Sequence, residues 1–120
     1  MQFPVEPIAP GYDATLAIAY PNAFADAVSL TSGVLVAQFR ASLDADAVLF
    51  EARSDAGSIV VAQGAEETSV TVTIPAASTT GMAPDTDVVF DFVRIDGAVK
   101  DVIPGLWRWP VRKAVTRDVS

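Results

Sequence analysis

The 120-residue chain contains no cysteine and no histidine. Without cysteine it forms no disulfide, thiolate nucleophile or zinc–thiolate site. Without histidine it lacks the commonest general base and the commonest transition-metal ligand. It also lacks a glycine-rich phosphate loop and a Gly-x-Ser-x-Gly nucleophile turn. We therefore expect a protein that is not an enzyme and that holds no cofactor or metal.

Long hydrophobic runs are missing too. The apolar stretches are far shorter than the roughly 20 residues that span a bilayer. The first 13 residues, MQFPVEPIAPGYD, have neither the positive charge nor the apolar run of a signal peptide. We therefore expect no membrane role. The length fits a single domain over residues 1–120.

Basic residues are scarce: 8 Lys and Arg stand against 15 Asp and Glu, for a net charge of −7. Residues 1–93 carry 12 acidic and 2 basic side chains, a net of −10, whereas residues 94–120 carry 3 and 6, a net of +3. An acidic body repels phosphate backbones, so direct nucleic-acid binding is not expected. The charge layout predicts an acidic body with a basic end.

Period-2 alternation of apolar residues predicts strands throughout. Residues 69–74, SVTVTI, alternate strictly, as in a sheet with one wet face. Residues 88–95 are mostly apolar at both parities, which is typical of a central strand, and Asp96-Gly97 then predicts a tight hairpin. The other predicted strands are 15–20, 34–42, 47–52, 58–63, 98–103 and 106–111.

Eight short strands with turns between them predict an all-β fold, an antiparallel β-sandwich or a small barrel. One segment does not alternate: residues 76–82 are expected to form a short helical turn at one end of the sandwich. Residues 1–12 and 112–120 are expected to be extended N-terminal and C-terminal arms, the second of them basic.

Paired carboxylates are the first candidate site. Asp44/Asp46 and Asp85/Asp87 are Asp-x-Asp pairs in predicted loops. They lack the glycine and the downstream glutamate of an EF-hand loop, and Asp side chains commonly bond nearby backbone in turns. We expect turn chemistry there, with cation binding as the alternative.

The predicted last strand holds both tryptophans of the chain. Trp107, Trp109 and Val111 share one face of it, and Arg108 lies on the other. We expect the tryptophan face to close the core. The alternative is an aromatic patch that binds a sugar or a protein, since Trp and Arg are enriched at interface hot spots. Pro110 cannot donate to a ladder, so the strand lies at an edge or ends there.

The basic arm follows directly, with Arg112, Lys113 and Arg117 against Asp118. It is either a solvated tail or an arm that binds the acidic surface of a neighbouring subunit. The candidate interface residues are therefore Trp107, Arg108, Trp109, Arg112, Lys113 and Arg117.

The order of strands and turns carries a family resemblance. A Phe-Pro start leads to the first strand, a Leu-Thr-x-Gly turn opens the second, and a Gly-x-x-x-x-Pro-Val strand is followed by Val-Thr-Arg; these are Phe3-Pro4, Leu30–Gly33, Gly105–Val111 and Val115–Arg117. The pattern resembles small immunoglobulin-like β-sandwich virion proteins of tailed bacteriophages and phage-like gene transfer agents.

The resemblance implies a structural, non-catalytic virion protein, made in the cytoplasm of a host bacterium. The implied role is a capsid decoration or cement protein that binds the major capsid protein or other virion subunits and forms a homo-oligomer in the particle. A neck or baseplate adaptor is the nearest alternative. From another class, a carbohydrate-binding module would use Trp107 and Trp109.

Overall fold

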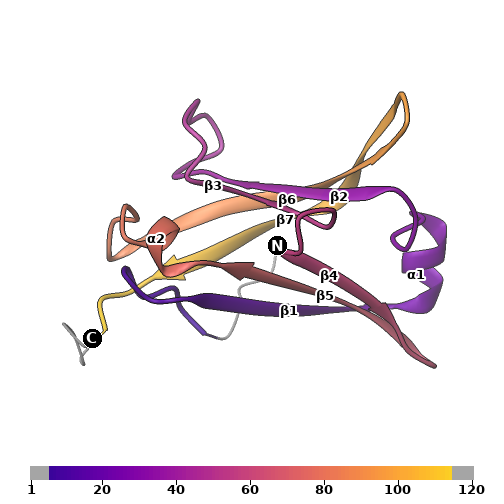
Figure 1. Ribbon diagram of the computed structural model, residues 1–120, viewed down its shortest axis with the longest axis horizontal. Coiled ribbons are helices and arrows are strands. Elements are labelled where there is room, and N and C mark those ends of the chain that lie inside the picture. Colours follow the sequence, from indigo (N-terminus) through magenta and orange to yellow (C-terminus); the bar gives the residue numbers. More distant parts are fainter. Residues whose placement is uncertain (1–5, 115–120) are drawn as a thin grey trace.

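The computed structural model describes residues 6–114, which form seven strands and two short helices (Figure 1). In chain order these are β1 Ala14–Pro21, α1 Asn22–Ala27, β2 Val34–Phe39, β3 Phe50–Arg53, β4 Ile59–Gln63, β5 Glu67–Ile74, α2 Ala76–Thr79, β6 Thr86–Asp96 and β7 Val99–Val111.

The strands form two antiparallel sheets, with the orders β1-β5-β4 and β3-β2-β6-β7. The chain changes sheet after β1, β3 and β5, which is the Greek-key connectivity of immunoglobulin-like sandwiches. The predicted β-sandwich is confirmed.

The three-stranded sheet follows the alternation of its sequence. Every second residue of β1 is buried, and Val70, Val72 and Ile74 of β5 point into the same core. The outer face carries small uncharged residues, with Thr15 opposite Thr73, Ala17 opposite Thr71 and Ala19 opposite Ser69. One face of this sheet is exposed to solvent and the other is buried, which is why its strands could be predicted from the alternation of apolar and polar residues.

The four-stranded sheet differs from expectation in its last strand. The predicted strands 98–103 and 106–111 are one strand, β7, so there are seven strands rather than eight. Phe90 pairs with Trp107 and Phe92 with Ile103, so a bulge absorbs the intervening Pro104-Gly105-Leu106. Gly105 has φ +125°, a conformation that glycine tolerates, and the expected turn is instead an irregularity within the ladder.

The connection between β2 and β3 shortens both predicted strands. Strand 34–42 ends at Phe39, and strand 47–52 becomes Phe50–Arg53. The Arg40 guanidinium donates to the carbonyl oxygens of Ala45 (3.0 Å) and Asp46 (2.6 Å), which folds the intervening loop back on itself. Backbone carbonyls that bond this side chain are not used in a ladder.

The helices also differ from expectation. Residues 22–27 form α1, a helix that was not predicted in the connection between the predicted strands 15–20 and 34–42, and the predicted helical turn 76–82 is the shorter α2. The hydroxyl of Thr79, which is fully buried at the end of α2, donates to the Tyr12 carbonyl oxygen at 2.7 Å. This bond fastens the segment before β1 to the end of the sandwich.

An aromatic cluster fills the centre of the core. The Phe39 ring lies 4.5 Å from that of Phe90 and 6.0 Å from that of Trp109, measured between centroids. Phe92 and Phe90 meet edge to face at 5.7 Å. The core thus joins β2 and β6 to the last strand, which holds the candidate interface residues.

Candidate protein interface

Trp109 belongs to the core. Its side chain is 1% exposed, and its Nε1–H donates to the Glu6 carbonyl oxygen at 2.7 Å. Val111, on the same face, is fully buried. The expectation that this face closes the core is confirmed, and the burial of Trp109 counts against a paired-tryptophan sugar platform.

Trp107 closes the gap between the two sheets on one side of the sandwich. Its indole meets Tyr20 of β1 edge to face at 6.5 Å and stacks on Phe90 at 6.4 Å. Neither the Tyr20 hydroxyl nor the Trp107 Nε1–H has a hydrogen-bond partner of good geometry. Burial raises the pKa of Tyr20, and the neighbouring Trp107 indole offsets part of that rise. A cleft of about 370 Å³ borders these two rings and Phe24.

The segment before β1 runs alongside the end of β7. The Ile8 N–H donates to the Pro110 carbonyl oxygen and the Arg112 N–H to the Ile8 carbonyl oxygen, both at 2.8 Å. Ile8 is fully buried, so the second half of the predicted N-terminal arm packs against the body. Pro110 lacks an N–H, which fits its place on an edge strand.

The basic candidates lie around the end of β7. Arg108 is half-buried on the face opposite the tryptophans, opposite Val89 in the register. Arg112 and Lys113 are exposed, and the Arg112 guanidinium donates to the Val111 carbonyl oxygen at 2.9 Å. Arg117 lies outside the described residues. The structure therefore brings Arg112 and Lys113 together at the surface and separates both of them from the buried tryptophans.

The outer face of the four-stranded sheet carries charge around an apolar centre. Val36, Val93 and Ile95 border a shallow cleft of about 250 Å³, whose other lining residues include Gln38, Glu51, Arg53, Asp91 and Lys100. Arg53 is paired with Asp55 at 2.9 Å, and this bond lowers the pKa of Asp55 and raises that of Arg53. Glu51 and Arg53 thus already have partners within the molecule.

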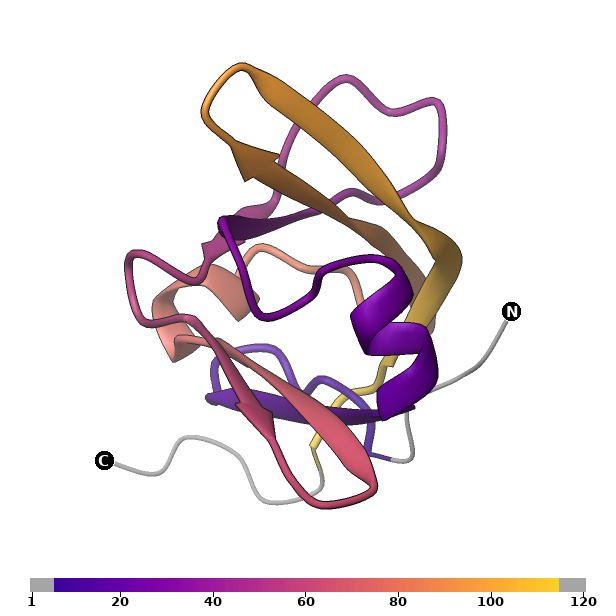
Figure 2. The ribbon, with the colours of Figure 1, turned by 90° about the vertical axis from the view of Figure 1, so that its right-hand side faces the viewer.

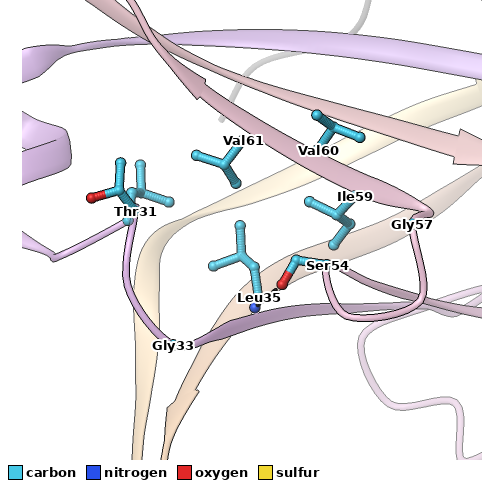
Figure 3. A pocket seen from close by; sticks show the side chains of 9 residues that line it. Thr31, Gly33, Leu35, Ser54, Gly57, Ile59, Val60 and Val61 are labelled. Atoms are coloured by element: carbon cyan, nitrogen blue, oxygen red, sulfur yellow. Dashed lines mark hydrogen bonds between the residues drawn. The ribbon is translucent and has the colours of Figure 1, made fainter.

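The opposite side of the sandwich carries a groove that the sequence did not predict, and the Leu30, Leu35 and Ile59 side chains beneath it are at most 3% exposed. The groove, of about 310 Å³, separates the start of β2 from β4, and Leu30, Leu35, Ile59 and Val61 line it (Figure 3). Gly33 shapes the rim: its φ is +74°, and a Cβ there would lie 2.6 Å from the Ile95 carbonyl oxygen. The sequence feature that could have indicated this groove is the run of apolar residues 59–62 in β4.

The Asp-x-Asp pairs lie in loops, as predicted, and the bonds that fasten these loops use the backbone. Arg40 bonds the backbone carbonyl of Asp46, and the Asp85 N–H, at φ +63°, donates to the Val111 carbonyl oxygen. Among residues 6–114, no three acidic side chains converge as a cation site would require.

The chain matches no protein-family model, no curated protein and no solved structure. In the part of the chain that the structure describes, no helix is long and apolar enough to cross a membrane.

Proposed function

We propose that this chain is a structural, non-catalytic virion protein of a tailed phage or phage-like particle, and that it decorates or cements the capsid surface. Its partners would be the major capsid protein or other virion subunits, including further copies of itself. The neck or baseplate adaptor remains the nearest variant of the same proposal.

The observation that carries the proposal is the basic end of an otherwise acidic sandwich. Arg112 and Lys113 are exposed directly after a strand whose inward side chains are locked in the core. A rigid scaffold that presents cations at its margin suits docking on an acidic neighbour, because complementary charge steers association and fixes its register. Residues 94–120 have a net charge of +3 against −10 for the rest of the chain.

The first test is the copy number of the protein in purified particles, measured by quantitative mass spectrometry against the major capsid protein. A ratio near one supports a decoration or cement protein, and a far smaller ratio supports the neck or baseplate variant. Absence from particles overturns the proposal.

A second test addresses the basic end. Deletion of residues 112–120 is expected to abolish particle binding while circular dichroism still reports the folded sandwich. The matched control is Lys100→Glu, which reverses one exposed cation on β7 far from the basic end. Full binding by the deletion variant would remove the basic end from the proposal.

A further inference from the structure

The strand β4 is an edge strand without the usual protection. It ends the order β1-β5-β4, and its residues, IVVAQ, include no charge and no proline. The ladder between β4 and β5 runs in unbroken register, without a bulge, and Val60 is 56% exposed. Natural edge strands are commonly blunted by lysine, proline or a bulge, and an unblunted one is a template for another strand.

The register shows which backbone groups of β4 are free. The Thr73 N–H donates to the Ser58 carbonyl oxygen, and the Gly64 N–H to that of Glu67. In an antiparallel ladder the bonded pairs alternate, so the even-numbered residues from 58 to 64 bond β5. The N–H and C=O groups of Ile59, Val61 and Gln63 therefore point away from the sheet.

The open groove lies directly beside these free groups. Strand β3 ends at Arg53, which pairs with Val36, and the Ser54 side chain and backbone take up the N–H and C=O of Leu35. The space between Leu35 and β4 is left to the groove, with Ile59 and Val61 on its floor (Figure 3). A strand added to β4 would seat alternate side chains in it.

Charge identifies the chemistry of the occupant. At the start of β4, Asp55 is already paired with Arg53 at 2.9 Å. At its end, Glu66 and Glu67 follow the strand, and the Gln63 side chain donates to the Asp26 carboxylate at 3.3 Å. The end of β4 is therefore acidic. The fitting occupant is an extended segment that is basic and rich in β-branched residues.

The chain itself contains such a segment. Residues 112–120, RKAVTRDVS, have three basic residues against one acidic residue and β-branched residues at 115, 116 and 119. Nine extended residues reach roughly 30 Å, more than the roughly 17 Å that five strand residues cover. The segment follows β7, which lies on the opposite side of the sandwich from β4 (Figure 2), so a second copy would supply it.

We propose that residues 112–120 of one copy add as a strand to the β4 edge of a second copy, beside the groove. This deepens the proposed function, on which it rests, because it assigns the partner of the basic end. Residues 112–120 and strand β4 are different surfaces of the chain, so the contact between copies is heterologous. Such contacts propagate into closed rings or open arrays.

Two substitutions in the full chain test the edge. Val61→Pro removes one outward N–H, and Val61→Ala is the matched control that keeps it. We expect sedimentation velocity to show concentration-dependent association of the natural chain, weakened about tenfold or more by Val61→Pro and much less by Val61→Ala. A monomer at every concentration, or equal association of both variants, overturns the proposal.

A second measurement does not depend on the folding of the proline variant. A mixture of isotopically labelled and unlabelled natural chain is treated with a zero-length carbodiimide cross-linker. We expect mixed-isotope products that join Lys113 to Glu66 or Glu67, weakened in Arg117→Glu, which keeps the reacting amine, and retained in Lys100→Glu. Products confined to single molecules, or directed elsewhere, overturn the proposal.

The proposal and the proposed function fail separately. A chain that is abundant in particles but monomeric in solution, without the Lys113 cross-link, refutes the strand addition alone. A chain that self-associates through β4 but is absent from particles refutes the virion role alone.

Discussion

The two sides of the sandwich are built differently. On the side of β1 and β7, Trp107 packs on Tyr20, Trp109 bonds the Glu6 carbonyl, and Ile8 lies along the end of β7. On the side of β3 and β4, the sheets end beside a groove of about 310 Å³, and β4 keeps free backbone groups. Figure 2 shows β7 and β4 on opposite sides of the body.

The two sides differ in the features that cover the edges of the sheets. Large side chains and an extra extended segment cover one side, together with Pro104 and Pro110 on the edge strand itself. The other side has aliphatic side chains of moderate size and a strand with none of those devices. Covered edges serve stability, and open edges are available to partners.

Breaking the closed side has the largest expected effect. Trp109→Ala removes the central indole and leaves the Glu6 carbonyl without its donor, so we expect a loss of about 3–5 kcal/mol in the free energy of unfolding. Chemical denaturation followed by circular dichroism measures it. Lys100→Ala on the exposed part of β7 is the control, with a change within about 0.5 kcal/mol. Equal losses would mean that the closed side is not where stability resides.

A smaller change in the free energy of unfolding should distinguish the β4 N–H groups that bond β5 from those that point away from the sheet. Val60→Pro removes a ladder N–H, whereas Val61→Pro removes an outward one, so the first should destabilise the chain by about 1–3 kcal/mol more than the second. Denaturant titration of both variants checks the order, with Val60→Ala and Val61→Ala as side-chain controls. The reverse order would contradict the assignment of the free groups.

The smallest effect concerns Tyr20 on the closed side. Because burial raises its pKa, the folded chain holds this proton above pH 10, where an unfolded tyrosine loses it. Its contribution to stability is complete below pH 10 and is lost as the pH rises through the folded pKa. We expect Tyr20→Phe to change stability by about 1 kcal/mol or less at pH 7 and to unfold at a higher pH. Identical alkaline unfolding curves would contradict this reasoning.

The same contrast explains what the sequence could predict. Alternation identified β1 and β5 because each has one wet and one dry face, and the inward placement of Trp107 and Trp109 followed from parity. The single strand β7 was missed, because Pro104-Gly105 has the composition of a turn and the bulge depends on its partner strand. The groove was missed because alternation does not report which strand ends a sheet. Arg117 lies outside the described residues, and its role stays a prediction.

The bond between Trp109 and Glu6 also bears on the order of folding. It joins residues 103 positions apart, and the ladder beside it pairs Ile8 with Val111. Pairings of such large sequence separation are slow to form, since the entropy of closing the loop is lost before the contact is gained. The closed side can be completed only when the last strand is in place. We therefore expect Trp109 to become buried late in refolding, on the millisecond-to-second scale that is usual for β-sandwiches. Tryptophan fluorescence would measure this burial.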